Sequence, residues 1–316
     1  PLVARAHGAA SSAGDPPRAE RRPPRPAAAA PARGRPLGAG RPVRGEFIEA
    51  GGARLYTYAA GTRGGGEPVV LLHGFPTSSH LWARVAPCLP DGHRVLLVDL
   101  LGYGRSDRPR GRPLTLRAHA ERVVELLDVL GVNYACVVGH DLGAGVAQQM
   151  AVRWPQRVAR LGLVSAVAYD DWPAREVRLA RAALPLTRHL PPTFLLSLLR
   201  KELLRGYGEA DAGARSVDRY ARPFATAEGR DALVEHLLAL DSAETQALAP
   251  RLKELVMPTA VIAGAHDPFL PPAVAERLAA DVPGATLDVL PDGRHYLPEE
   301  QPRAVADAIG RLLARD

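Results

Sequence analysis

The stretch Val137-Val138-Gly139-His140-Asp141-Leu142-Gly143-Ala144-Gly145 decides the fold of this chain. A β-branched run leads into it, and a helical pattern rich in small residues leads out of it. Between them lies Gly-x-Asp-x-Gly, the pattern of a nucleophile elbow, in which a strained strand-to-helix turn lifts one side chain above a sheet. We therefore expect Asp141 to lie at the tip of such a turn.

Steric crowding explains the two glycines of the motif. Gly139 and Gly143 flank Asp141 because a Cβ atom at either position would collide with the neighbouring strand or helix. Leu142 begins the helix, so its N–H group has no partner within the helix and points toward negative charge.

Strand and helix patterns alternate on both sides of this motif. We expect strands at 47–50, 55–59, 68–72, 94–98, 136–138, 158–164, 260–263 and 286–290, and helices at 81–89, 116–130, 144–151, 273–280 and 302–313. Such alternation predicts an α/β fold with a mostly parallel, twisted sheet flanked by helices.

The chain divides by composition into three parts. Residues 1–44, rich in Arg, Pro and Ala, are expected to be a disordered tail. Residues 45–165 and 251–316 are expected to form the α/β core. Residues 166–250 are helical in pattern, rich in Leu and Arg, and predict a helical cap over the carboxyl edge of the sheet, where open α/β sheets bind ligands.

Charge and composition exclude several classes of function. The net charge of +6 resides in the tail, where nine arginines face only Asp15 and Glu20, so the remainder carries −1 and predicts no nucleic-acid partner. No apolar run is long enough for a membrane span. Cys88 and Cys136 are expected to be two separate buried thiols, which suits a reducing cytoplasm.

Several motifs in order carry a family resemblance. His73-Gly74-Phe75-Pro76 comes first, the Asp141 elbow second, and then a late aspartate and a late histidine. This order resembles the α/β-hydrolase superfamily over residues 45–316, in the sequence nucleophile, acid, histidine. The aspartate at the elbow is similar to that of epoxide hydrolases and haloalkane or haloacetate dehalogenases.

The resemblance implies a role for each motif residue. Asp141 would be the nucleophile, and His295, after the last expected strand, the general base that activates water. Asp267 would orient His295, with Asp170 or Asp171 as the alternative acid. The backbone N–H groups of Phe75 and Leu142 would form the oxyanion hole.

An aspartate at the elbow favours attack on saturated carbon. Its carboxylate is ionised at neutral pH and forms an ester that water can cleave, whereas a serine would leave an ether. The expected substrate is a small hydrophobic epoxide or alkyl halide, hydrolysed with water.

Epoxide opening is the favoured reaction. It needs hydroxyl donors, and Tyr169, Tyr207 and Tyr220 lie in the expected cap together with Trp172, a candidate to line the pocket or contact halide. Haloalkane dehalogenases usually have Trp after the nucleophile, where this chain has Leu142, and Phe75 stands where an Asn could hold halide. Hydrolysis of a carbon–halogen bond is the alternative, followed by a non-hydrolytic ligand-binding protein or lyase.

No cofactor is expected. The chain lacks a metal-ligand cluster, a phosphate-binding glycine loop and a dinucleotide fingerprint.

Overall fold

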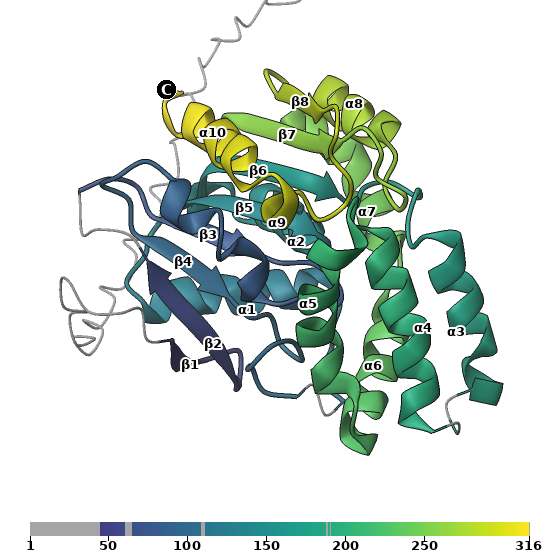
Figure 1. Ribbon diagram of the computed structural model, residues 1–316. Helices are drawn as coiled ribbons and strands as arrows, with labels where there is room; N and C mark the ends of the chain where they lie inside the picture. Colours follow the sequence, from purple (N-terminus) through teal and green to yellow (C-terminus); the bar gives the residue numbers. More distant parts are fainter. Residues whose placement is uncertain (1–44, 61–64, 109–110, 188, 190, 316) are drawn as a thin grey trace, which may run out of the picture. The chain divides into compact units, whose positions relative to one another are not determined.

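The computed structural model describes residues 45–60, 65–108, 111–187, 189 and 191–315. These residues form a mixed β-sheet with helices packed against it (Figure 1). Its strands are β1 (Glu46–Ala50), β2 (Ala53–Ala60), β3 (Val69–Leu72), β4 (Val95–Val98), β5 (Ala135–Asp141), β6 (Val158–Ala166), β7 (Thr259–Gly264) and β8 (Thr286–Leu290). The expected tail at residues 1–44 lies outside the described residues.

The order of the strands across the sheet is β1-β2-β4-β3-β5-β6-β7-β8. β1 and β2 form the predicted hairpin, and β2 pairs antiparallel with β4. From β4 to β8 every pairing is parallel. The carboxyl ends of these parallel strands therefore meet at one edge, and this arrangement confirms the predicted α/β-hydrolase fold class.

Helices connect the strands. The α-helices are α1 (Leu116–Val129), α2 (Leu142–Arg153), α3 (Arg175–Thr187), α4 (Pro192–Arg205), α5 (Ala210–Ala221), α6 (Ala227–Ala239), α7 (Ala243–Leu248), α8 (Pro272–Asp281), α9 (Leu297–Glu300) and α10 (Pro302–Leu313). The 3₁₀ segments are η1 (Ser79–Trp82), η2 (Ala86–Cys88), η3 (Pro155–Arg157), η4 (Arg222–Phe224) and η5 (Ala249–Glu254).

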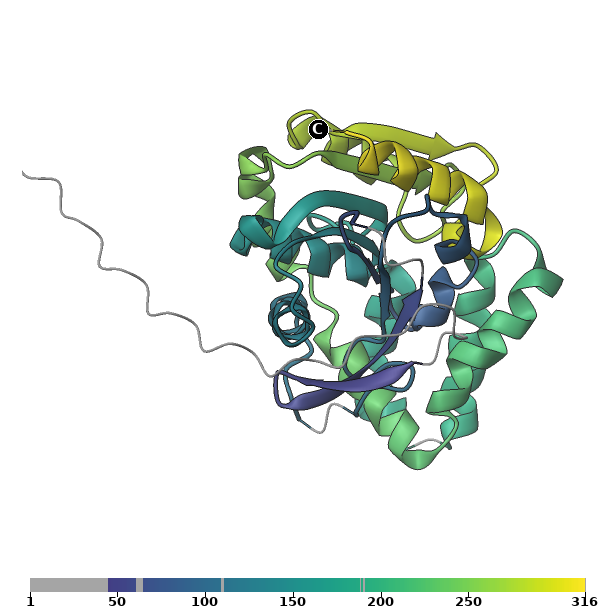
Figure 2. The ribbon, with the colours of Figure 1, turned by 90° about the vertical axis from the view of Figure 1, so that its left-hand side faces the viewer.

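Alternate residues of the central strands bury opposite faces of the sheet. In β3, Val70 and Leu72 pack in the cluster formed with α1 and α2, whereas Val69 and Leu71 pack in the cluster formed with η1 and α10. This follows from the two-residue period of a strand, and it needs helices on both faces. Figure 2 shows α10 on one side of the sheet and α1 and α2 on the other.

The helices α3, α4, α5 and α6 form a separate helical group. They contact one another and stand together beside the sheet, at the end toward which the β6 arrow points (Figure 1). Between β6 and β7, the segment 166–250 is therefore mainly helical, beginning with α3 at Arg175.

Two local predictions are wrong. The expected helix at 81–89 is replaced by η1 and η2, since Pro87 lacks the N–H group that a continuous helix requires. Cys88 is exposed, because η2 ends there at the surface, while Cys136 is buried in β5 as expected. Both thiols are free.

Candidate active site

Asp141 lies at a sharp turn between β5 and α2. Its backbone has φ 51° and ψ −120°, a strained conformation for a residue with a side chain. A Cβ atom at Gly139 would lie 2.2 Å from the backbone oxygen of Gly143, and one at Gly143 would lie 2.5 Å from the carbonyl oxygen of His73. The close approach predicted for the two glycines is therefore confirmed.

Backbone N–H groups surround the Asp141 carboxylate. The N–H of Leu142 donates to Oδ1 at 2.6 Å, and the N–H of Phe75 also hydrogen-bonds to this carboxylate. The structure thus brings both expected donors to Asp141. Burial raises the pKa of Asp141 to about 6, although His295 and the two N–H groups lower it.

His295 lies in the loop between β8 and α9. Its Nδ1 atom is 2.8 Å from Oδ2 of Asp267, and its Nε2 atom is 3.9 Å from Oδ2 of Asp141. The Nε2 atom of His140 lies 2.8 Å from the carbonyl oxygen of His295, so His140 helps to hold the loop that carries His295. Burial favours the neutral ring of His295, but the Asp267 and Asp141 carboxylates outweigh it, and the pKa is raised.

Asp267 follows β7 and is held from three directions. Oδ2 faces His295, while Oδ1 accepts hydrogen bonds from the N–H groups of Phe269 at 2.9 Å and Leu270 at 3.0 Å. Burial opposes its charge, yet His295 and these N–H groups lower the pKa of Asp267. The alternative acids, Asp170 and Asp171, are exposed, so the structure selects Asp267 as the partner of His295.

A small cavity of about 90 Å³ opens beside Asp141 and His295. Its other lining residues are mainly apolar: Phe75, Pro76, Val167, Trp172, Pro173, Ala174, Val177, Leu199, Glu202, Leu203, Leu240, Phe269, Leu270 and Tyr296. The lining comes both from loops of the α/β core and from residues 166–250. The cavity therefore suits a small apolar molecule placed against one carboxylate and one imidazole.

The structure places the four residues expected to bind substrate as follows. Trp172 lines the cavity, but its indole N–H donates to Oγ1 of Thr245 at 2.8 Å. The hydroxyl of Tyr169 donates to Asp281 at 2.7 Å. Tyr207 and Tyr220 both donate to the buried Glu299, at 2.5 and 2.6 Å. None of the three tyrosines is among the described residues that line this cavity.

Sequence reasoning missed Tyr296. It follows His295 directly, lines the cavity and is 2% exposed. Its ring lies 4.9 Å from that of His295 and stacks on the ring of Tyr207 at 4.4 Å. The one signal in the sequence was its position directly after His295.

The described residues offer no site for a metal. In ranges 45–60, 65–108, 111–187 and 191–315, no group of three or more His, Cys, Asp or Glu side chains is arranged to hold an ion. No described helix combines the length and apolarity that crossing a membrane requires.

Comparison with known proteins identifies the family of this fold. A sequence profile of the alpha/beta hydrolase fold matches residues 67–302. A dihydrolipoyllysine-residue acetyltransferase component of the acetoin cleaving system of Cupriavidus necator is 33% identical over 79% of this chain, which spans 64% of that relative's length. Haloalkane dehalogenase 2 of Mycobacterium bovis is 29% identical, over 85% of this chain and 94% of its own.

Solved structures share the fold. A hydrolase from Pseudomonas aeruginosa is 29% identical, with a TM-score of 0.71 over 88% of this chain and 100% of its own. The enol-lactonase from Burkholderia xenovorans is 25% identical, with a TM-score of 0.73 over 85% of this chain and 100% of its own. The matched profile covers most of the chain, so this protein belongs to the alpha/beta hydrolase fold family.

Proposed function

We propose that this hydrolase attacks a saturated carbon with Asp141 and releases the product by hydrolysis of the resulting ester. One observation carries the proposal: Oδ2 of Asp141 lies 3.9 Å from Nε2 of His295, whose other nitrogen is fixed at 2.8 Å by Asp267. The separation exceeds a hydrogen bond, so Oδ2 is available as a nucleophile. The ring is at the same time oriented to act on a water beside the ester.

In the first step, Oδ2 of Asp141 forms a bond to a carbon of the substrate, and the bond from that carbon to its leaving group breaks. In the second step, Nε2 of His295 takes a proton from water, and the hydroxide attacks Cγ of Asp141. The oxyanion on the Asp141 carboxyl group accepts hydrogen bonds from the N–H groups of Phe75 and Leu142. The ester bond then breaks, the product alkoxide recovers a proton from His295, and the Asp141 carboxyl group loses the proton that arrived with the hydroxide, which restores the carboxylate and, after epoxide opening, the donor hydroxyl.

The electrostatics of the site divide the work between two carboxylates. Asp141 has a pKa of about 6, so it remains ionised at neutral pH while being poorly solvated, and poor solvation leaves its oxygen reactive. Asp267 is fully hydrogen-bonded and stabilises the positive charge that His295 acquires in the second step.

We propose epoxide opening, giving a vicinal diol, as the reaction. The opening oxygen needs a proton, and we assign its donation to the hydroxyl of Tyr296, because Tyr296 lines the cavity directly after His295. Tyr169, Tyr207 and Tyr220 are excluded as donors in this state because each hydroxyl already donates to a carboxylate. The small apolar cavity favours an epoxide of few carbon atoms.

The second candidate is hydrolysis of a carbon–halogen bond. It is favoured by relatives named haloalkane dehalogenase, which are 28% and 29% identical to this chain. A halide leaving group needs N–H donors rather than a proton. Here Leu142 and Phe75 bring no side-chain donor, and the indole N–H of Trp172 is bonded to Thr245.

We propose further that residues 166–250 form a cap that shapes this pocket. Trp172, Val177, Leu199, Leu203 and Leu240 come from this segment, and all line the cavity at Asp141. They would set substrate size, whereas the core loops carry the reacting groups.

A matched pair of substrates tests the choice. The protein is incubated with 1,2-epoxybutane and with 1-bromobutane, and diol and bromide are measured. The proposal predicts diol, and Tyr296→Phe is expected to lower epoxide turnover about 100-fold while bromide release changes by no more than about twofold.

Three other results would contradict the proposal of epoxide opening. Bromide release without diol would select carbon–halogen hydrolysis. Binding of either compound without product would select the non-hydrolytic alternative. Equal losses on both substrates in Tyr296→Phe would assign Tyr296 a packing role.

A further inference from the structure

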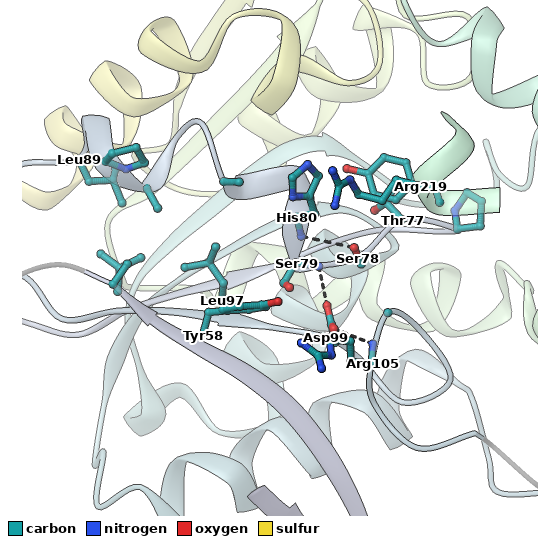
Figure 3. A pocket seen from close by; sticks show the side chains of 18 of the residues that line it. Tyr58, Thr77, Ser78, Ser79, His80, Leu89, Leu97, Asp99, Arg105 and Arg219 are labelled. Atoms are coloured by element: carbon teal, nitrogen blue, oxygen red, sulfur yellow. Dashed lines mark hydrogen bonds between the residues drawn. The ribbon is translucent and has the colours of Figure 1, made fainter. Parts of the chain in front are cut away.

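A second and larger cavity lies apart from the Asp141 carboxylate. Its volume is about 720 Å³, against about 90 Å³ for the cavity at Asp141, and Pro76 is the one residue common to the two described linings. It lies along β2 and β4 on one side and η1, η2 and the junction of α5 with η4 on the other (Figure 3). The proposed function gives this space no role.

Aliphatic side chains line one part of the large cavity. Val95 and Leu97 of β4, Ala60 of β2 and Leu89 beside η2 contribute aliphatic surface, and Tyr58 of β2 adds an aromatic ring. Figure 3 shows Leu89 at one end and Leu97 further along. Aliphatic walls of this kind favour an alkyl chain.

Polar groups gather at the opposite end. His80, Arg219, Asp99 and Arg105 lie there in Figure 3, together with Ser78. This is the end at which β4 stops and the carboxyl edge of the sheet begins. The cavity is therefore amphipathic along its long axis.

The side chains that line the polar end carry two positive charges, on Arg105 and Arg219, and one negative charge, on Asp99, while the Glu299 carboxylate behind them is bonded by Tyr207 and Tyr220. The Asp99 carboxylate is 2% exposed and already accepts hydrogen bonds from the N–H groups of Ser79 at 2.7 Å and Arg105 at 2.8 Å. The Arg105 guanidinium donates to the Tyr56 hydroxyl at 2.9 Å and lies over the Tyr56 ring, so it has a neutral partner. Arg219 and Arg105 therefore both line this end of the cavity, and the one carboxylate that lines it with them already accepts two backbone N–H bonds.

Arg219 is the less engaged of the two cations. It is exposed on α5, and among the ion pairs of the described residues none includes it. Burial and the nearby charge of Arg219 lower the pKa of His80, so this imidazole is neutral and offers an N–H donor. At the far end Asp91 is exposed, and the His93 ring contacts the Glu67 carbonyl oxygen at 2.8 Å.

We propose that the large cavity binds an amphipathic monocarboxylate, with its carboxylate between Arg219 and Arg105 and its alkyl chain along Leu97, Val95 and Leu89. The length of β4 sets the size of the ligand. Val95 begins the strand and Asp99 follows it, a span of ~13 Å, which matches an extended chain of about ten carbon atoms. This site is independent of the chemistry proposed at Asp141.

Calorimetric titration of the full chain with decanoate, below its micelle concentration, tests the proposal. We expect one decanoate per chain, with at least tenfold weaker binding of 1-decanol, which lacks the charge, and of acetate, which lacks the chain. Arg219→Ala is expected to weaken decanoate binding about tenfold. Arg215→Ala is the matched control, because Arg215 is exposed on the same helix but does not line the cavity.

Two filling variants locate the ligand. Ala60→Trp, which fills the large cavity, is expected to reduce decanoate binding, and Val177→Trp, which fills the cavity at Asp141, is expected to leave it unchanged. The reverse pattern would overturn the proposal, as would equal binding of decanol and decanoate or an unchanged affinity in Arg219→Ala. Thermal unfolding of each variant confirms that it is folded.

Discussion

Asp141 and Asp267 are the same side chain placed after two different strands, and both face His295. Asp267 follows β7, accepts two backbone N–H bonds and bonds the imidazole at 2.8 Å, and its pKa is lowered. Asp141 ends β5, stands 3.9 Å from the imidazole, and burial raises its pKa to about 6. Each carboxylate accepts two backbone N–H bonds, so what distinguishes them is the direct hydrogen bond to the imidazole, which Asp267 makes and Asp141 does not.

The difference originates in the backbone. At Asp267 the chain turns back, so the N–H groups of Phe269 and Leu270 point at Oδ1. At Asp141 the strained turn places the side chain beside the cavity, with Oδ2 3.9 Å from Nε2 of His295 and therefore beyond hydrogen-bond distance of the ring. Four predictions break or sharpen this comparison.

Replacing Asp141 is expected to have the largest effect. Asp141→Ala removes the attacking oxygen, so turnover of any substrate should fall by on the order of 10⁴-fold or more. Steady-state kinetics measures the loss, with Asp170→Ala as the control because Asp170 is an exposed carboxylate. Turnover within tenfold of the parent would show that Asp141 does not react.

Replacing Asp267 is expected to slow only the second step. In Asp267→Asn the imidazole loses its anionic partner and its fixed tautomer, so ester hydrolysis should slow by about 10³-fold. Alkylation of Asp141 should continue, because it needs no general base. Rapid-quench analysis should therefore show accumulated ester, and its absence would contradict the division of roles.

The two steps should titrate at different pH. Alkylation needs ionised Asp141, so its single-turnover rate should rise with pH through a midpoint of about 6. Hydrolysis needs neutral His295, whose pKa is raised above its ordinary value, so the rate of hydrolysis should rise with pH through a higher midpoint than the rate of alkylation. The same midpoint for both rates would indicate that Asp141 and His295 titrate as one coupled unit.

Stability should move in opposite directions at the two sites. A raised carboxylate pKa means that ionisation destabilises the folded state once the pH exceeds the unfolded value, so Asp141→Asn at pH 7.5 should stabilise the protein by about 1–3 kcal/mol. The lowered pKa of Asp267 contributes stability that is lost as pH falls, so Asp267→Asn should destabilise it by a similar amount. Urea unfolding measures both, and equal signs would contradict the comparison.

The sequence predicted the core well because its signals are local. The bounds of β8 and α10 agree with the predicted ranges, and the elbow glycines are explained by contacts within five residues and the adjacent strand. The loops carrying Asp267 and His295 follow strands whose patterns are plain, and the sheet topology then brings them together.

The helical segment was less predictable because its contacts are long-range. Tyr207 and Tyr220 donate to Glu299, which lies 92 and 79 residues away in the sequence, and Trp172 donates to Thr245 across 73 residues. No periodicity encodes which hydroxyl faces a cavity and which faces a carboxylate. The assignment of Tyr296 therefore required the structure.

The most direct test of the account is mass spectrometry of His295→Gln after incubation with 1,2-epoxybutane. This variant retains the Asp141 carboxylate but lacks the base that activates water. The account predicts an added mass equal to that of the epoxide, located on the peptide that contains Asp141. Unmodified Asp141, under conditions in which the parent protein consumes the epoxide, would contradict it.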